Sequence, residues 1–228
     1  LLVAIDLLPK SEFALDRAGL LADELEAELS VLHVVSPVSS ERVLEQSLQM
    51  ATARMKSRLR SPLWRAKTIP DVVVRAGNPA RVILDTIVRD EPDLLIVGPH
   101  ERRGGVDALQ GTIIEKAVSS RRCPVLVVQQ SASPDYRNVL LALDVAAGSR
   151  AAVGAAERFV LRDGVRATAI HAFASPDHAV LQMPGTEGAA AAMHADCSSG
   201  TASLAMRELL ERESADPTRY EVIVAQGN

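Results

Sequence analysis

Short apolar runs alternate along the first half of the chain with longer stretches in which apolar residues recur every three or four positions. The short runs predict strands and the longer stretches predict helices between them. Runs that are apolar on both faces are typical of a parallel sheet covered by helices on each side. We therefore predict an α/β fold for this half, with five strands at residues 1–5, 30–35, 71–76, 93–98 and 124–129.

The stretches between these strands carry signals for where helices begin. Ser11 is expected to cap the first helix, and residues 41–59 are expected to form a long second helix. Asn78 followed by Pro79 is a typical helix start, and this third helix is expected to run to about residue 90. Thr112, with an acid three residues later, has the pattern of a capping box for a helix at 113–119.

The pattern of the first half begins again at Tyr136. The stretch YRNVLLALDVAAGSRAA parallels LLVAIDLLPKSEFA, and the terminal YEVIVAQGN parallels DVVVRAGN. This predicts a tandem duplication, with a complete first unit over residues 1–130, a linker near 130–135 and a second doubly wound unit over 136–228. The matched positions include Asp144 with Asp6, Ser149 with Ser11 and His171 with His33.

The second unit breaks off at Asn228, the counterpart of Asn78. It therefore lacks counterparts of the fourth strand, of the glycine-containing loop after it and of the fifth strand. Because a sheet of three strands is expected to pack poorly by itself, we expect further sequence beyond this point. A natively incomplete unit is the alternative.

Composition narrows the classes of function. The chain has 228 residues, of which 47% are hydrophobic and 24% charged, as in an ordinary globular protein. The formal net charge of −4 gives no reason to expect a nucleic-acid partner. No apolar run approaches the roughly 20 residues that span a bilayer, so we expect no membrane partner. Two cysteines form no disulfide framework, which makes a reduced, cytoplasmic setting the default.

The expected strand order, 3-2-1-4-5, places the first strand beside the fourth. The loops after Ile5 and Val97 would then flank one crevice at the carboxyl ends of the strands, where doubly wound sheets bind ligands. Gly111 and Thr112 begin a helix whose free N–H groups and dipole suit an anion, so phosphates would lie near Gly98, Gly111 and Thr112. A base or ribose would lie near Asp6, since a carboxylate repels phosphate and accepts hydrogen bonds.

These residues resemble the universal stress protein family, over nearly all of the first unit and less closely over the second. The family's phosphate loop is Gly, two residues, Gly, nine residues, Gly, then Ser or Thr, and here the first and last positions are Gly98 and Gly111-Thr112. "AID" resembles the strand end that brings an aspartate, here Asp6, to adenine. "LHVV" resembles the strand whose backbone, at Val34 or Val35, meets adenine.

The resemblance implies a regulatory protein of the stress response that binds ATP or a related adenine nucleotide in its first unit. Mg2+ is expected only together with bound ATP. "CPVLVV" resembles the family's last strand, which pairs with its equivalent in a partner domain. Residues 125–128 are therefore expected to pair either between copies, as in a dimer, or between the two units of one chain.

One position departs from the family's pattern, because Glu101 stands where the second glycine is expected. A carboxylate about 5 Å from a phosphate charge costs on the order of 3 kcal/mol at an effective dielectric near 20. Arg102 and Arg103 could offset this by pairing with Glu101 or with the phosphates, and His100 could also reach a phosphate. The alternative is a loop that no longer binds nucleotide, in a protein that serves as a dimerising scaffold.

Simpler roles are open for the same residues. Asp6 and Asp144 suit Asx turns that start the following helices, and Gly111-Thr112 suits a plain helix cap. His33 and His171 lie within strands and are expected to bond to neighbouring backbone. A metal site is not expected, because the candidate ligands match no strong spacing template; they are Asp177, His178, His194 and Cys197.

Enzymatic activity is not expected either, and no catalytic residue is predicted. The chain carries no GxxxxGK[ST] loop and no GxSxG arrangement. The predicted phosphate loop has no lysine and no evident metal-binding acid to drive phosphoryl transfer. At most, slow incidental ATP hydrolysis would accompany nucleotide binding.

Overall fold

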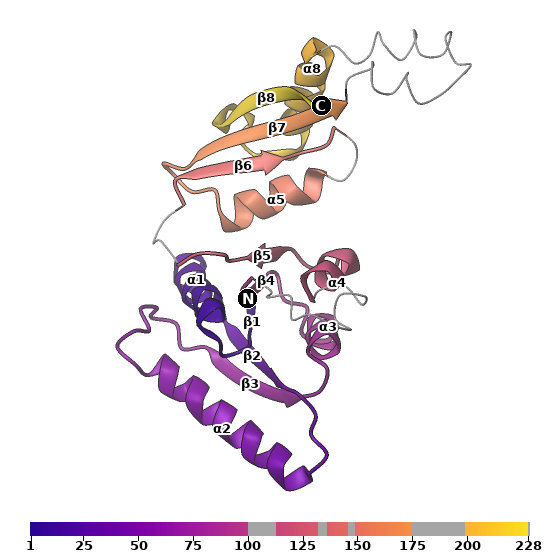
Figure 1. Ribbon diagram of the computed structural model, residues 1–228. Helices are drawn as coiled ribbons and strands as arrows, with labels where there is room; N and C mark the ends of the chain where they lie inside the picture. Colours follow the sequence, from indigo (N-terminus) through magenta and orange to yellow (C-terminus); the bar gives the residue numbers. More distant parts are fainter. Residues whose placement is uncertain (100–112, 132–135, 146–148, 175–198, 228) are drawn as a thin grey trace, which may run out of the picture. The chain divides into compact units, whose positions relative to one another are not determined.

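The computed structural model describes residues 1–99, 113–131, 136–145, 149–174 and 199–227. Contacts between Cα atoms divide the chain into two compact units, Leu1–Pro134 and Asp135–Asn228 (Figure 1). The boundary between them falls within the stretch predicted as a linker. Each unit is built around its own parallel sheet.

The sheet of the first unit has the predicted order, β3-β2-β1-β4-β5, and all of its strands are parallel. The doubly wound fold predicted for this unit is therefore confirmed. Strands β4 and β5 are three residues long, shorter than the six-residue runs that predicted them. The five strands are β1 (Leu2–Ile5), β2 (Ser30–Val35), β3 (Asp71–Ala76), β4 (Leu95–Val97) and β5 (Val125–Val127).

Among the described residues, four helices connect these strands and cover both faces of the sheet, with α1 and α2 on one side and α3 and α4 on the other (Figure 1). This arrangement follows from right-handed crossovers, because the chain first moves from β1 towards β3 and then returns to β4 and β5. The helices are α1 (Pro9–Leu25), α2 (Glu41–Leu59), α3 (Pro79–Asp90) and α4 (Ile113–Ser120).

Alternate residues of the strands face the two helical layers. Leu2 and Leu32 pack with Ile83 and Ile87 of α3, whereas the neighbouring Val31 lies on the α1–α2 side of the sheet. The strands are therefore buried on both faces. This explains why their sequences are continuous apolar runs.

One predicted helix start is wrong. Ser11 lies within α1 and does not cap it, since the helix begins at Pro9 and its N-cap residue is Leu8, whose side chain makes no capping hydrogen bond. Proline suits the first position of a helix because its φ is already helical and it has no N–H to satisfy. The Ser11 hydroxyl instead donates to the Leu8 carbonyl at 2.9 Å. The Asn78 cap is confirmed, because its side chain accepts from the Arg81 N–H at 3.2 Å.

The second unit has a three-stranded parallel sheet with the order β6-β7-β8. Its core lies on one face, where Leu141, Ala169 and Tyr220 pack with Val153 of α5 and Met206 of α8. The preceding side chain of β6, Leu140, lies on the other face of the sheet and is 65% exposed. The elements are β6 (Asn138–Ala142), α5 (Ser149–Phe159), β7 (Arg166–Ala174), α8 (Ser199–Glu213), a 3-10 turn η2 (Pro217–Arg219) and β8 (Tyr220–Gly227).

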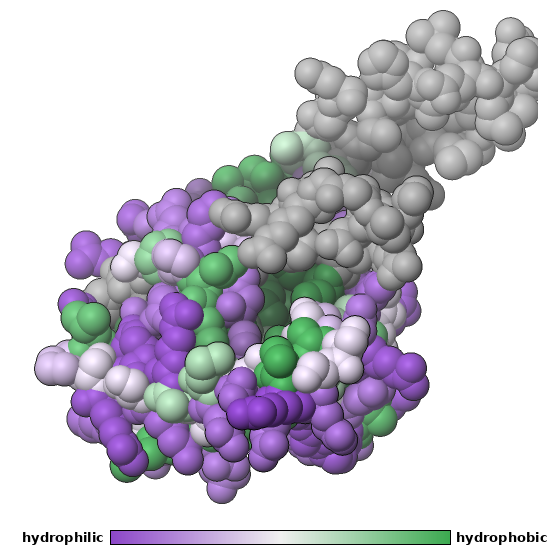
Figure 2. Space-filling view, turned by 60° about the horizontal axis from the view of Figure 1, so that its bottom comes forward, coloured by the Kyte–Doolittle hydropathy of each residue, from purple (hydrophilic) through white to green (hydrophobic). Residues whose placement is uncertain are grey.

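The surface is mainly hydrophilic on the face seen in Figure 2, where apolar residues occur in small groups between polar ones. Such scattered apolar residues are normal for the surface of a globular protein. Within the described ranges, no helix combines the length and the apolar character that crossing a membrane requires.

Candidate functional site

The sequence predicted a ligand crevice after β1 and β4, and the structure places the ends of these two strands side by side. In the pairing of these strands Ala4 lies opposite Val97, so Asp6 and Gly98 follow at the same edge of the sheet. The helix after β1 turns to one face and the described helix after the β4 loop lies on the other (Figure 1). The structure thus brings together two of the predicted ligand-binding residues at the point where the winding reverses.

Asp6 begins the turn between β1 and α1. Its Oδ1 accepts a hydrogen bond from the Leu8 N–H at 3.0 Å, which is the Asx turn that the sequence allowed. The side chain is exposed, as a group that meets a ligand must be. Leu7, between Asp6 and Leu8, has a positive φ of 62°. Residues other than glycine adopt such a φ only where other contacts hold the backbone.

His33 is structural, as predicted. Its Nδ1 is hydrogen-bonded to the Ile5 carbonyl at 2.8 Å, and this contact ties the end of β1 to β2 immediately before Asp6. Beyond that point β2 extends past β1, because the pairing with β1 ends at Ile5 and His33 whereas Val34 and Val35 still pair with β3. The Val34 side chain packs among the residues beneath α3. Any contact of Val34 with a ligand would therefore involve its backbone.

Gly98 has a packing role that the sequence did not reveal. A Cβ added at this position would lie 3.0 Å from the Cα of Ser11 and 3.2 Å from the carbonyl oxygen of Lys10. Both are backbone atoms of the first turn of α1, so they cannot rotate away. The glycine therefore allows the end of β4 to approach α1 closely, whether or not a phosphate also lies there.

The other predicted site residues, His100, Arg102, Gly111 and Thr112, lie outside the described residues, as do Glu101 and Arg103. The next described residue is Ile113, where α4 begins as predicted. Three of the seven predicted nucleotide-binding residues are thus placed by the structure: Asp6, Val34 and Gly98.

A cluster of charges between α1 and α2 went unnoticed in the sequence. Arg58 of α2 donates from Nε to Glu12 and from Nη2 to Asp16, the latter at 2.6 Å. Burial raises the pKa of Asp16 more than the charge of Arg58 lowers it. Burial tends to lower the pKa of Arg58, but the hydrogen bond to Glu12 and the charge of Asp16 raise it. The sequence feature that could have predicted this cluster is the spacing of Glu12 and Asp16, which places two carboxylates one helical turn apart on the same face of α1.

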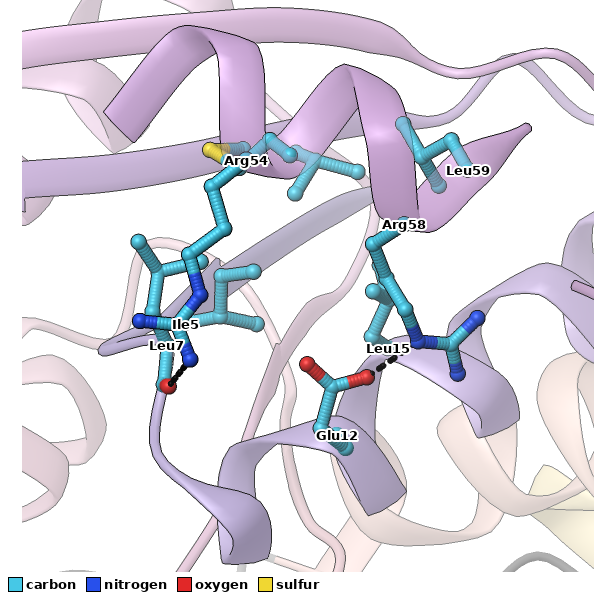
Figure 3. A pocket seen from close by; sticks show the side chains of 9 residues that line it. Ile5, Leu7, Glu12, Leu15, Arg54, Arg58 and Leu59 are labelled. Atoms are coloured by element: carbon cyan, nitrogen blue, oxygen red, sulfur yellow. Dashed lines mark hydrogen bonds and ion pairs between the residues drawn. The ribbon is translucent and has the colours of Figure 1, made fainter. Parts of the chain in front are cut away.

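A cavity of about 200 Å3 lies beside this cluster, between α1 and α2 (Figure 3). Its walls are mostly aliphatic, and two arginines of α2 reach across it. Arg54 donates to the Leu7 carbonyl and Arg58 to Glu12 (Figure 3). The cavity lies on the α1–α2 face of the sheet. Its lining residues are Ile5, Leu7, Glu12, Leu15, Val31, Arg54, Met55, Arg58 and Leu59.

The second unit repeats one contact of the first. His171 Nδ1 is hydrogen-bonded to the Leu143 carbonyl at 3.0 Å, and the two residues are 28 positions apart, as are His33 and Ile5. This places Asp144 after β6 as Asp6 is placed after β1. The turn differs in detail, because the backbone N–H of Asp144 donates to the Ser149 hydroxyl at 2.8 Å.

Cys123 is a free, half-buried cysteine, and burial raises the pKa of its thiol, which disfavours the reactive thiolate. Among the residues whose positions are described, no three His, Cys, Asp or Glu side chains lie close enough to hold a metal ion. Asp177, His178, His194 and Cys197 lie outside those residues.

Comparison with known proteins gives consistent matches. The model of the Universal stress protein family matches residues 1–129. Universal stress protein A homolog 1 of Coxiella burnetii is 28% identical over 142 residues, which cover 56% of this chain and 94% of that protein. The crystal structure of a universal stress protein from Archaeoglobus fulgidus aligns with a TM-score of 0.66 at 16% identity, covering 100% of this chain and 77% of that chain. A universal stress protein crystallised in complex with cAMP covers 57% of this chain and 95% of that chain, at 23% identity and a TM-score of 0.40.

Proposed function

Because the chain belongs to the universal stress protein family, we propose that its first unit binds an adenine nucleotide, with ATP as the main candidate. Occupancy of the site would then bias the protein's assembly or its choice of partner, which makes it a regulator in the stress response. We propose no catalytic role beyond slow incidental ATP hydrolysis.

The observation that carries this proposal is the position of Asp6 and Gly98 at the carboxyl ends of two adjacent strands. An exposed carboxylate accepts hydrogen bonds from base or ribose, and a glycine at the neighbouring strand end begins the predicted phosphate loop. The backbone of Val34, on the part of β2 that extends past β1, would meet the base.

The phosphate side of the proposed site comes from the sequence. Gly111 and Thr112 immediately precede α4, whose N-terminus would face the phosphates. Arg102 and His100 would add positive charge or hydrogen-bond donors, and Arg102 would offset the repulsion from Glu101. Mg2+ would accompany ATP as the counter-ion of its phosphates and is not proposed without it.

We further propose that residues 136–228 form a second domain of the same family, so that the chain is a tandem protein. Support comes from the repeated histidine contact and from the order β6-β7-β8, which matches β1-β2-β3. The alignment with the Archaeoglobus fulgidus protein, which extends over the whole chain, supports a common fold. We propose a cytoplasmic setting, since the two cysteines suggest no disulfide framework.

The second candidate is a scaffold that assembles without nucleotide. It is favoured by β5, which is an edge strand of the five-stranded sheet and consists of half-buried valine and leucine. An edge strand of this kind needs a covering partner. Residues 125–128 would pair with their equivalents in a second copy or with the second unit. Neither nucleic acid nor membrane is proposed as a partner.

The deciding experiment is mass spectrometry of nucleotides released from the denatured protein, followed by calorimetric titration with ATP and with cAMP. We expect Asp6→Ala to weaken ATP binding about tenfold or more, because it removes a charge-assisted hydrogen bond to the ligand. Asp71→Ala is the matched control, since this exposed aspartate begins β3 at the opposite edge of the sheet. Absence of adenine-nucleotide binding at millimolar concentration would overturn the proposal.

A further variant separates the two candidates. Glu101→Gly restores the glycine of the family's pattern. A large gain in ATP affinity would show that this carboxylate weakens or closes the site. The scaffold would be favoured if, in addition, the native protein does not bind ATP. A native protein that already carries about one ATP per chain would favour the nucleotide sensor.

A further inference from the structure

The turn that carries Asp6 is held in a conformation that it would not adopt alone. Leu7 lies in the left-handed region with φ of 62°, which is unfavourable for a residue with a branched side chain. Such a backbone persists only where its surroundings fix it. Two hydrogen bonds do so here: the Leu8 N–H donates to Asp6 Oδ1 at 3.0 Å, and Arg54 Nη2 donates to the Leu7 carbonyl at 2.9 Å.

The second of these hydrogen bonds comes from far along the chain. Arg54 belongs to α2, 47 residues after Leu7, and its side chain extends from the helix to the turn (Figure 3). Ile5 and Leu7 line the cavity of about 200 Å3 that lies between this turn and α2. Because side chains do not fill this space, Arg54 bridges it in place of close packing.

The helix that presents Arg54 is itself anchored. One helical turn further on, Arg58 donates to Glu12 and Asp16 of α1, which fixes α2 against α1. Arg58 therefore holds the two helices together, and Arg54 uses that fixed position to reach the turn. The two arginines are close in sequence but make different contacts, Arg54 with the turn after β1 and Arg58 with α1.

We propose that Arg54 is a positioning residue for the ligand site at Asp6. Its guanidinium holds the Leu7 carbonyl, and this keeps the Asp6 carboxylate in the orientation in which it accepts the Leu8 N–H. The effect of Arg54 on nucleotide recognition rests on the proposed function. The effect of Arg54 on the conformation of the turn is independent of the proposed function and can be measured without any ligand.

The first test is amide hydrogen exchange, measured by NMR on the full chain without nucleotide. We expect the Leu8 amide to exchange about three- to tenfold faster in Arg54→Met, which keeps the aliphatic stem and loses the charged donor. Arg54→Lys should restore most of the protection. Lys56→Ala removes an exposed positive charge from the same helix and should leave Leu8 unchanged. An unchanged Leu8 amide in Arg54→Met, or an equal change in Lys56→Ala, would overturn the proposal.

The second test concerns recognition of the base, with ATP and ITP as probes. ITP carries an oxygen where ATP has an amino group, and an Asp6 carboxylate that contacts the base would accept a hydrogen bond from this amino group. If the native protein prefers ATP, Arg54→Met should reduce this preference by about threefold or more while affecting ITP little. An equal loss for both nucleotides would contradict a role in placing Asp6 against the base. If the native protein binds neither, the proposed function fails and the exchange experiment alone decides the role of Arg54.

Discussion

Gly98 illustrates how one residue can carry a structural role and a proposed functional role at once. Its missing side chain lets the end of β4 approach the backbone of Ser11 and Lys10, so a Cβ there would force these backbone atoms to shift by a few tenths of an ångström. The same absence would leave room for a ligand at the start of the loop. Loss of nucleotide binding in a Gly98 variant would therefore not separate the two roles. Asp6 is exposed and makes no close packing contact of this kind, although its carboxylate also accepts the Leu8 N–H.

Asp23 provides a test of stability at the scale of one residue. It ties the segment before β3 to α1, because its carboxylate accepts from the N–H groups of Lys67 and Thr68 and from the Thr68 hydroxyl, each at 2.7 Å. Burial alone would raise the pKa of Asp23, but these hydrogen bonds outweigh it and lower the pKa below its usual value of 3.8. We expect Asp23→Asn to reduce the free energy of unfolding of the first unit by about 0.5–1.5 kcal/mol at pH 7.

The pH dependence of this effect has a definite sign. A carboxyl group with a lowered pKa in the folded state stabilises the fold above its unfolded pKa and loses that contribution as pH falls through the folded pKa. The difference between native protein and Asp23→Asn should therefore shrink below about pH 3.8. Urea unfolding at pH 7 and pH 3.5 measures it, with the exposed Asp71→Asn as control. A difference that stays constant with pH would contradict this explanation.

At the scale of elements, the two sheets differ in how their faces are covered. In the first unit α3 and α4 cover the face that contains Leu2 and Leu32. In the second unit α5 and α8 cover one face, while Leu140 of β6 and Ile223 of β8 are 65% and 41% exposed. These two side chains lie on the same face of the sheet, on strands separated by β7. Exposed apolar side chains on one face of a sheet are typical of surfaces that bind a further element.

Substitutions at adjacent positions of β6 test this difference between the faces. We expect Leu140→Lys to reduce binding of the dye ANS and any self-association, without lowering the melting temperature of the second unit, because Leu140 is mostly exposed. Leu141→Lys should instead unfold that unit, since Leu141 is 6% exposed and a charge there would be buried. Sedimentation velocity and calorimetry provide the measurements. Equal loss of stability in both variants would show that the two faces are buried alike.

At the scale of the whole molecule, the chain consists of two units with separate cores. Met206 and Leu210 are central to the core of the second unit, whereas Leu95 and Ile83 belong to the first. Asp6 and every described group that fixes its turn belong to the first unit. Stability of the second unit and ligand binding by the first are therefore expected to be separable.

A core truncation in the second unit tests this independence. Met206 is fully buried, so Met206→Ala should reduce the free energy of unfolding of that unit by about 2–4 kcal/mol. Nucleotide affinity should not change. Differential scanning calorimetry should show two transitions, of which this substitution shifts one and Ile96→Ala, in the first unit, shifts the other. A single transition that both variants shift equally would contradict the independence of the units.

The sequence by itself determined the order of the first sheet, the bounds of β2, α2 and β3, and the cap at Asn78. The bounds and the cap depend on periodicity and on signals within a few residues, which are local. The strand order follows from the alternation of strands and helices together with the winding that is usual for such folds. The sequence also predicted that His33 would bond to backbone. The roles of Gly111, Thr112, His100 and Arg102 stay predictions, supported by spacing alone.

Only the tertiary structure decided how the turn after β1 is held. The contact of Arg54 with Leu7 joins residues 47 positions apart, and the pairing of Arg58 with Asp16 joins residues 42 positions apart. Neither contact has a local pattern, because it depends on how α2 lies against α1 once the sheet has formed. The close approach of Gly98 to Ser11 has the same origin. The physical reason is that local sequence sets which elements form, whereas packing between elements sets which side chains meet.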